Sequence, residues 1–253
     1  MSSFDAARAA QCISQWLAGQ VAGAGARGAM VNISGGLDSA VVGALCVHAL
    51  PGRTAGLILP CYSAQEDVEH ARVVADRFGI PVEIIDLGPV YDLLTGACGR
   101  AFAGLTGQQD PAPAGVTANV KARLRMVTLY YFANRLNYLA VGTGNLSELT
   151  VGYFTKYGDG GVDLLPIGGL VKAETRDLAR YLGVPQAVID KPPSAGLWPG
   201  QTDEGELGFT YAELDAYIRT GMAPGALTER IETLRAQSAH KRTVPPVPGC
   251  CPQ

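Results

Sequence analysis

Asn32-Ile-Ser-Gly-Gly-Leu-Asp-Ser39, set between two apolar stretches, decides how this chain is organised. The pattern predicts a buried strand, a Ser/Gly-rich turn and the start of a helix. Adjacent glycines let the backbone come close to a ligand, and Ser34 and Ser39 add hydroxyl donors. Because the next helix directs its free N–H groups and positive end at the turn, the segment predicts an anion site, and a phosphate chain is the expected anion.

A carboxylate belongs to the same turn. Asp38 stands beside the expected phosphates, which suits a hard cation such as Mg²⁺. The spacing is not that of Walker A, since no Gly-Lys-Ser/Thr follows four residues after a glycine, and it is not the GxGxxG fingerprint. A turn that merely joins a strand to a helix is the alternative. Asp38 and Ser39 at these offsets, with a strand before them, favour phosphate binding.

Strand-like apolar runs alternate with helical periodicity through the first two thirds of the chain. The expected strands are 29–33, 55–59, 82–85, 138–141 and 163–165, and the helices among them are 38–50, 64–78, 115–136 and 172–182. This alternation predicts an α/β fold, a doubly wound parallel sheet of five strands with helices on both faces. Ligands of such folds bind beyond the carboxyl ends of the strands, where the Ser/Gly turn and the turn at 143–148 fall.

Outside this alternation, helical spacing recurs at 4–21, 210–219 and 226–237. Two glycine- and proline-rich segments, 153–161 and 191–208, are expected to be long loops that are either functional lids or disordered.

Bulk composition excludes several classes of function. The chain has 253 residues, 47% of them apolar, and a net charge of −3. This charge gives no reason to expect nucleic acid or an anionic membrane as a partner. No segment reaches transmembrane length and no signal peptide is recognised, so we expect no membrane association. Six cysteines without a CxxC pair favour a reducing, cytoplasmic location.

Further polar candidates for a binding site lie between residues 119 and 241. Asn119, Arg123 and Met126 share one face of a helix beside an apolar stripe, and Arg123 is a candidate to grip a carboxylate or phosphate. Glu148 could complete a metal site with Asp38, although Asn-x-x-Glu is also a helix-capping pattern. Other candidates, each with a solvated-surface alternative, are Lys156, Asp159, Asp163, Lys172, His240 and Lys241.

Taken together, these motifs resemble those of NAD synthetases over nearly the whole chain. The matching segments are Ser34–Ser39, Asn119–Met126, Gly142–Glu148, Gly152–Asp163, Pro193–Trp198, Gly200–Gly208 and His240–Arg242. The first is shared with other ATP pyrophosphatases, such as asparagine and GMP synthetases, whereas Lys-Tyr-Gly-Asp-Gly-Gly is more particular to NAD synthetases. The resemblance implies a fold like that of the adenine nucleotide alpha hydrolases.

The resemblance also implies a reaction. ATP adenylates the nicotinate carboxyl of deamido-NAD, ammonia displaces AMP, and NAD, AMP and pyrophosphate result. Site residues carry over position by position. ATP contacts fall on Asn32, Ile33, Ser34, Gly35, Gly36, Leu37, Asp38, Ser39, Thr143, Lys172 and Ser194; deamido-NAD contacts fall on Arg123, Lys156, Asp163, His240 and Lys241. Mg²⁺ would be held by Asp38 and Glu148. The catalytic candidates are Asp159, for the attack by ammonia, and Lys172.

Only one short helix precedes the Ser/Gly turn, so we expect residues 1–253 to form a single synthetase domain without a glutaminase domain. Ammonia is then the expected nitrogen donor. The resemblance further implies a homodimer with the deamido-NAD site at the subunit boundary. Another adenylating enzyme of the superfamily, such as a tRNA-modifying one, is the alternative, but this mildly acidic chain lacks a basic face for RNA. A nucleotide sensor without catalysis is a second alternative.

Overall fold

Four parallel strands form the sheet of this protein, which is seen in a computed structural model that describes residues 4–109, 112–198 and 200–248. The order is β3-β2-β1-β4. The strands are β1 (Gly28–Asn32), β2 (Thr54–Ile58), β3 (Val82–Ile84) and β4 (Tyr138–Val141). β1 lies between β2 and β4, and its central residues are at most 2% exposed. Such burial on both faces is typical of parallel strands, and it explains the continuous apolar run in the sequence.

The predicted fifth strand at 163–165 is wrong in extent, because this segment makes only one parallel bridge, between Val141 and Leu164. The Asp163 carboxylate accepts the Ala140 N–H at 2.8 Å, so a side chain takes a donor that a neighbouring strand would have used. Pro166 follows two residues after the bridge and has no N–H to continue the ladder.

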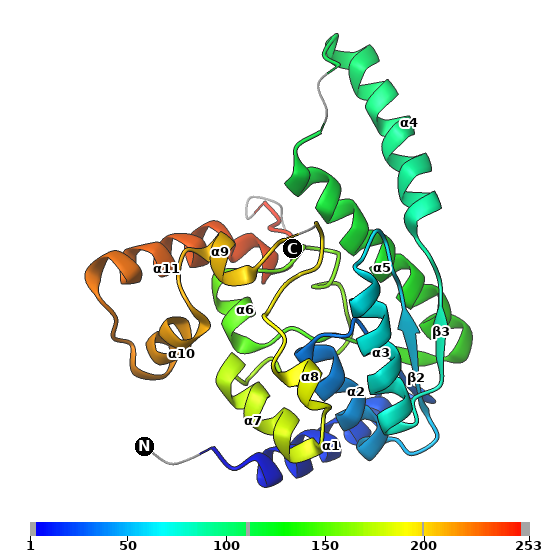
Figure 1. Ribbon diagram of the computed structural model, residues 1–253, viewed down its shortest axis with the longest axis vertical. Coiled ribbons are helices and arrows are strands. Elements are labelled where there is room, and N and C mark those ends of the chain that lie inside the picture. Colours follow the sequence, from blue (N-terminus) through cyan, green and yellow to red (C-terminus); the bar gives the residue numbers. More distant parts are fainter. Residues whose placement is uncertain (1–3, 110–111, 199, 249–253) are drawn as a thin grey trace.

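Helices cover both faces of the sheet, as the sequence predicts (Figure 1). On one face, α1 (Ala6–Gly23), α2 (Leu37–Ala49) and α7 (Lys172–Leu182) pack together, flanked by α3 (Gln65–Phe78) and α8 (Gln186–Ile189). On the other, α5 (Ala114–Leu136) packs against β1 and β4. Alternate residues of β1 divide between the two cores: Val31 joins Leu45 and Leu178, whereas Met30 joins Leu129.

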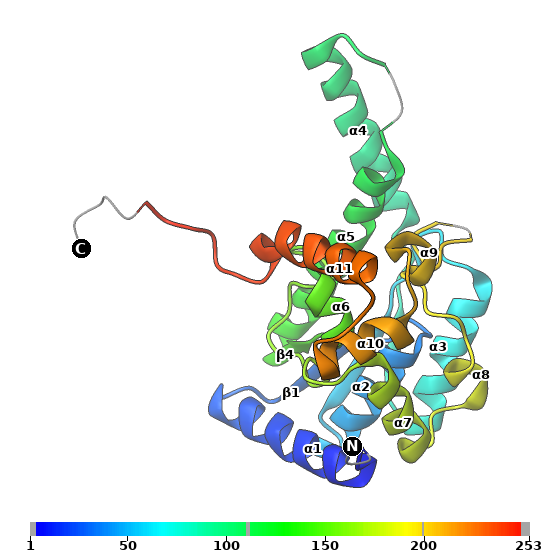
Figure 2. The same ribbon diagram turned by 90° about the vertical axis from the view of Figure 1, so that its left-hand side faces the viewer.

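One long helix was not predicted. α4 (Gly88–Thr106) extends away from the body together with the start of α5 (Figures 1 and 2). Only Gly88 of α4 is buried, while Leu93 and Leu105 are 75% and 86% exposed. Among the described helices, α4 included, none has the length and apolar character needed to cross a membrane.

A smaller helical layer adjoins the carboxyl ends of the strands (Figure 2). It consists of α6 (Leu146–Val151), α9 (Asp203–Leu207), α10 (Tyr211–Thr220), α11 (Gly225–Gln237) and the 3₁₀ turn η1 (Ala239–Lys241). Its core contains Val151, Leu207, Leu214 and Ile231. α9 lies within the segment predicted as a loop, where Thr202 caps the helix by accepting the Gly205 N–H. That part of the loop prediction is wrong.

The α1–α2–α7 core can be tested by truncation. Leu45 is fully buried in α2, so Leu45→Ala is expected to lower the free energy of unfolding by about 2–5 kcal/mol. The matched control is Met222→Ala, at a side chain that is 74% exposed, with an expected change within about 0.5 kcal/mol. Urea denaturation of both variants measures the difference, and equal midpoints would contradict this assignment of the core.

Candidate functional site

The turn after β1 is held in shape before any ligand arrives. Gly35 has φ of +79°, and a Cβ on it would lie 2.2 Å from the Asp67 carbonyl oxygen, so no other residue fits there. The Ser34 N–H donates to Ser39 Oγ at 3.1 Å, and the Ser39 hydroxyl donates to the Gly36 carbonyl at 3.0 Å. Gly36 caps α2 without a side chain. The first N–H groups of α2 therefore remain available to an anion.

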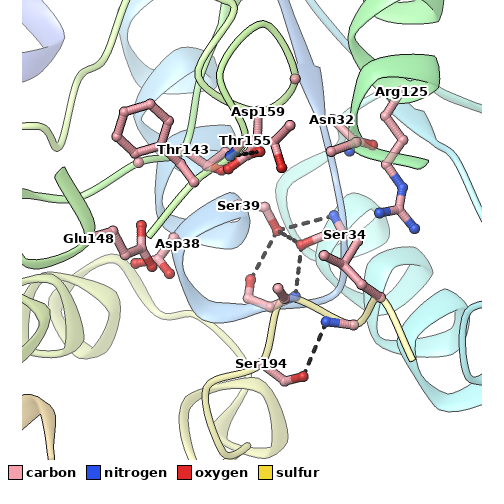
Figure 3. A pocket seen from close by; sticks show the side chains of 18 of the residues that line it. Asn32, Ser34, Asp38, Ser39, Arg125, Thr143, Glu148, Thr155, Asp159 and Ser194 are labelled. Atoms are coloured by element: carbon pink, nitrogen blue, oxygen red, sulfur yellow. Dashed lines mark hydrogen bonds between the residues drawn. The ribbon is translucent and has the colours of Figure 1, made fainter. Parts of the chain in front are cut away.

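A cavity of about 480 Å³ opens in front of this turn (Figure 3). Of the predicted ATP contacts, all but Gly35 line it: Asn32, Ile33, Ser34, Gly36, Leu37, Asp38, Ser39, Thr143, Lys172 and Ser194. Gly35 instead packs against the backbone of α3. Glu148, Asp159 and Lys241 also line the cavity. Segments far apart in the sequence thus converge on one volume, as the sequence predicts.

Lys172 forms the electrostatic centre of the cavity. Its ammonium lies 2.6 Å from Asp38 Oδ2 and 3.2 Å from Glu148 Oε1, and the residue is only 3% exposed. Asn145 ties the two carboxylates together, since its side-chain amide donates to Asp38 and its backbone N–H donates to Glu148 Oε2. Its side-chain oxygen also caps α6 by accepting the Glu148 N–H. The capping interpretation of Asn-x-x-Glu is confirmed. The other carboxylate oxygen of Glu148, Oε1, contacts Lys172 in the cavity, so the Glu148 side chain both caps α6 and lines the site.

Burial and charge perturb these groups strongly. Burial raises the pKa of Glu148 to about 8, with the nearby Asp38 charge adding to the effect and Lys172 opposing it. The two carboxylates raise the pKa of Lys172 above its usual value against the effect of burial, so the ammonium stays charged. Two carboxylates that face one another across a buried site (Figure 3) make a strongly cation-attracting region.

The donor set fits Mg²⁺ on chemical grounds, because carboxylate oxygens are hard ligands. Within the described ranges, no group of three or more His, Cys, Asp and Glu side chains could hold a metal ion. Asp38 and Glu148 would thus supply two ligands at most, and water and phosphate oxygens the others, which is the usual way that Mg²⁺ binds.

Asp159 lies on the turn that follows α6 and also lines the cavity (Figure 3). Its carboxylate accepts the Thr155 N–H at 2.8 Å, and the Thr155 hydroxyl donates to Asn119 Oδ1 at 2.7 Å. Desolvation raises the pKa of Asp159, against the effect of its backbone hydrogen bonds. Lys241 anchors the same turn by donating to the carbonyls of Gly152 and Phe154, each at 2.7 Å.

Four predicted dinucleotide contacts do not line the cavity of the single chain: Arg123, Lys156, Asp163 and His240. Arg123 is exposed and donates weakly to the Lys156 carbonyl, and the Lys156 ammonium donates to the His240 carbonyl at 2.7 Å. These three residues neighbour the Asp159 turn on its outer side. Asp163 has a structural role at β4, where it also accepts the Tyr130 hydroxyl.

Of the predicted face of α5, Asn119 and Met126 line the cavity and Arg123 does not. The lining face also carries Ala118, Ala122, Arg125 and Leu129, so Arg125 and not Arg123 reaches the cavity. The Arg125 guanidinium donates to the Leu59 carbonyl at 3.1 Å and to Ser63 Oγ at 3.2 Å. Both arginines flank the same apolar stripe, and no local pattern separates them.

Residues on the 191–208 segment were also missed. Lys191 pairs with Asp67 of α3, and both line the cavity. Lys121 is 8% exposed and donates to the Leu197 carbonyl at 2.7 Å. These contacts place the segment against the cavity. They join groups that are more than 70 residues apart, for which the sequence offered no signal.

Fold and site define a class: an α/β protein of the nucleotide-binding type, with a Ser/Gly turn open to an anion at the end of β1 and a buried ammonium between two carboxylates beside it. The model of the family "NAD synthase" matches residues 9–245. An NH(3)-dependent NAD(+) synthetase from Carboxydothermus hydrogenoformans is 47% identical, over 92% of this chain and 93% of that protein. The chain belongs to the NAD synthase family and is a ligase. The resemblance seen in the sequence is confirmed.

Solved structures support the same family assignment. NMN synthetase from Francisella tularensis is similar with a TM-score of 0.90 and 35% identity, over 98% of this chain and 100% of that one. An NH3-dependent NAD synthetase from Campylobacter jejuni has a TM-score of 0.77 and 26% identity, over 97% and 99% of the two chains.

The steric demand at Gly35 generates a prediction. Gly35→Ala is expected to displace the turn and weaken MgATP binding at least about tenfold, because the new Cβ clashes with the Asp67 carbonyl. Gly52→Ala is the matched control. Gly52 has a similar φ of +70° but no atom within 4 Å of a Cβ. Both variants should lose about 1–2 kcal/mol of stability from the positive φ, and only Gly35→Ala should lose affinity in titration calorimetry. Equal affinities would refute the role of the turn.

Proposed function

We propose that this protein amidates deamido-NAD with ammonia at the expense of ATP, yielding NAD, AMP and pyrophosphate through an adenylated carboxylate. The observation that carries the proposal is the convergence of the phosphate loop, the Asp38–Lys172–Glu148 centre and the Asp159 turn on one cavity. The family and its ammonia-dependent members support it.

The phosphate end of the cavity suits the first step. The N–H groups of α2 and the hydroxyls of Ser34 and Ser39 would bind the β and γ phosphates of ATP. Lys172 would stabilise the charge that develops on the departing pyrophosphate. The carboxylate of the acceptor attacks the α phosphorus and pyrophosphate leaves, so the protein need supply no nucleophile. Catalysis of this step rests on positioning and electrostatics.

Mg²⁺ fits this proposal at Asp38 and Glu148, where it would neutralise phosphate charge when bound. Lys172 already compensates one of the two carboxylates, so the ATP-free centre is not left with two unpaired negative charges. That compensation keeps the two carboxylates close together in a buried site.

The Asp159 turn suits the second step. Ammonia must attack the acyl carbon of the adenylate as an uncharged amine, after which AMP leaves and the amide nitrogen loses a proton. A buried carboxylate with a raised pKa is a suitable group to orient the amine or accept that proton. We therefore assign the amidation step to Asp159.

Ammonia is proposed as the immediate donor because the curated relatives that match along nearly their full length are NH(3)-dependent. We propose that residues 1–253 act as one synthetase domain. A cytoplasmic location agrees with Cys12, Cys46, Cys61 and Cys98, which are all free thiols.

A homodimer would explain the exposed apolar surface. On α5, Val116, Val127 and Tyr131 are more than half exposed, and α4 exposes Leu93 and Leu105 further out. Surfaces of this kind mark contacts between subunits. A partner on this side would also enclose the outer face of the Asp159 turn, where Arg123, Lys156 and His240 lie. Those residues could then contact the distal part of the acceptor.

A second acceptor has its own support. The high structural similarity to NMN synthetase supports a mononucleotide acceptor, the deamidated form of NMN. The chemistry at the carboxyl group would be identical, and only the distal contacts would differ. The two acceptors are therefore alternatives for one active site.

One assay tests the proposal. The purified chain is incubated with ATP and Mg²⁺, with either acceptor, and with ammonium or glutamine in parallel. NAD and AMP from ammonium support the principal proposal, while a higher kcat/KM with the mononucleotide supports the second acceptor. Formation of ADP in place of AMP would contradict both.

Asp38→Ala is expected to abolish AMP formation, because it removes one of the two carboxylates proposed to hold Mg²⁺. The variant should stay folded, since Glu148 still pairs with the buried Lys172. Asp177→Ala, which breaks an exposed pair with Arg180, is the control and should keep full activity. Circular dichroism and AMP quantification measure the outcome, and near-normal turnover of Asp38→Ala would exclude the metal assignment.

Asp159→Asn is expected to impair amidation more than adenylation. The amide can still accept the Thr155 N–H but cannot take a proton. Pyrophosphate exchange reports the first half-reaction and amide formation reports the second. Asp190→Asn, at an exposed carboxylate, is the control. Equal loss in both half-reactions would count against the proposed role of Asp159.

A further inference from the structure

The helix that carries Lys172 is only partly capped by its own residues: Glu174 accepts the Val171 N–H, but no residue of α7 accepts the N–H groups of Lys172 and Ala173. α7 begins at Lys172, and the preceding residue, Val171, has no side-chain oxygen to accept the free N–H groups. An ammonium in the first turn is also opposed by the helix dipole. Both conditions are unfavourable at a buried position, so other residues must stabilise this terminus.

Asp215 of α10 supplies the missing acceptors. Its Oδ2 accepts the Ala173 N–H at 2.8 Å, and its Oδ1 accepts the Ser147 hydroxyl at 2.5 Å. Ser147 Oγ in turn accepts the Lys172 N–H at 3.0 Å. Asp215 is 7% exposed and Ser147 is fully buried. A negative charge at the start of α7 also offsets the positive end of its dipole.

This network joins two of the three helices that bear the charged centre, α6 and α7. Ser147 precedes Glu148 on α6, and Lys172 begins α7, so one carboxylate fixes both backbones relative to each other. Figure 3 shows Glu148 beside Asp38 in the cavity that Lys172 also lines. A small shift of α7 against α6 would change the ammonium–carboxylate distances, to which a buried ion pair is sensitive.

A second residue of α10 reaches the other end of the lysine. Tyr211 lies one turn before Asp215 and so shares its helix face. The Lys172 ammonium lies 4.9 Å from the centre of the Tyr211 ring, and the Tyr211 hydroxyl donates to Asp203 Oδ2 at 2.9 Å. α10 therefore contacts the backbone of Ala173, next to Lys172, through Asp215 and the Lys172 ammonium through Tyr211.

We infer that Asp215 is a positioning residue for ATP binding: through Ser147 and the first turn of α7 it holds the Lys172 ammonium where the phosphates bind. The inference rests on the proposed ATP site. A carboxylate can accept both donors, whereas the amide of asparagine can accept only one and turns a donor toward the other. Asp215→Asn thus loosens the network at nearly constant volume.

The experiment is a double-mutant cycle with MgATP as the probe. Asp215→Asn is measured in the wild-type chain and in a Lys172→Met background by titration calorimetry. We expect about tenfold weaker MgATP binding in the first and no further weakening in the second, because Asp215 acts through the lysine. In steady state, KM for ATP should rise while KM for ammonium stays unchanged. Ser147→Ala is the second variant, with a loss in the same direction, should Asp215→Asn fold poorly.

Tyr217→Phe is the matched control on the same helix. The Tyr217 hydroxyl donates to Glu232 at 2.6 Å and thus links α10 to α11 away from Lys172, so its loss should leave MgATP affinity unchanged. Equal weakening by Asp215→Asn in both backgrounds, or unchanged affinity in the wild-type background, would overturn the inference alone. Absence of MgATP binding by the wild-type chain would overturn the proposed function with it.

Discussion

A buried ammonium between two carboxylates is the constraint on which the functional end of this molecule depends. Lys172 stays charged at 3% exposure because carboxylates pair with it, and its ammonium in turn lets Asp38 and Glu148 lie close together. Each of the three residues comes from a different helix. Their mutual dependence therefore fixes α2, α6 and α7 relative to one another at the carboxyl end of the sheet.

The same interaction explains why the site is prepared for a polyanion and a divalent cation together. The raised pKa of Glu148 means that a proton offsets its charge at neutral pH, and a second cation that binds here takes the place of that proton. The free N–H groups of α2, beside it, attract phosphate. Opposite charges are thus presented side by side, and a metal–nucleotide complex satisfies both at once. The enzyme pays for this arrangement with desolvation, as the raised pKa of Glu148 shows.

The sequence predicted much of this site because its signals are local. The strand before Asn32, the glycines at 35 and 36 and the Asn145–Glu148 cap each act within a few residues of one another, so their pattern is legible in a short window. The fifth strand failed because the Asp163 side chain, and not the backbone, takes the free donor of β4. Arg125 and Asp215 escaped notice because their partners lie 42 or more residues away, and α4 because its apolar residues face outward.

The contact of Asp163 and Leu164 with β4 limits the ways in which molecules of this protein can associate. It satisfies the outer edge of β4, and at the other side of the sheet β3 is only three residues long and carries the exposed Glu83. Neither edge offers a long row of free donors and acceptors onto which a strand from another chain could add. The sheet is thereby protected against edge-to-edge aggregation, and the extensive apolar surface that remains for contact is helical.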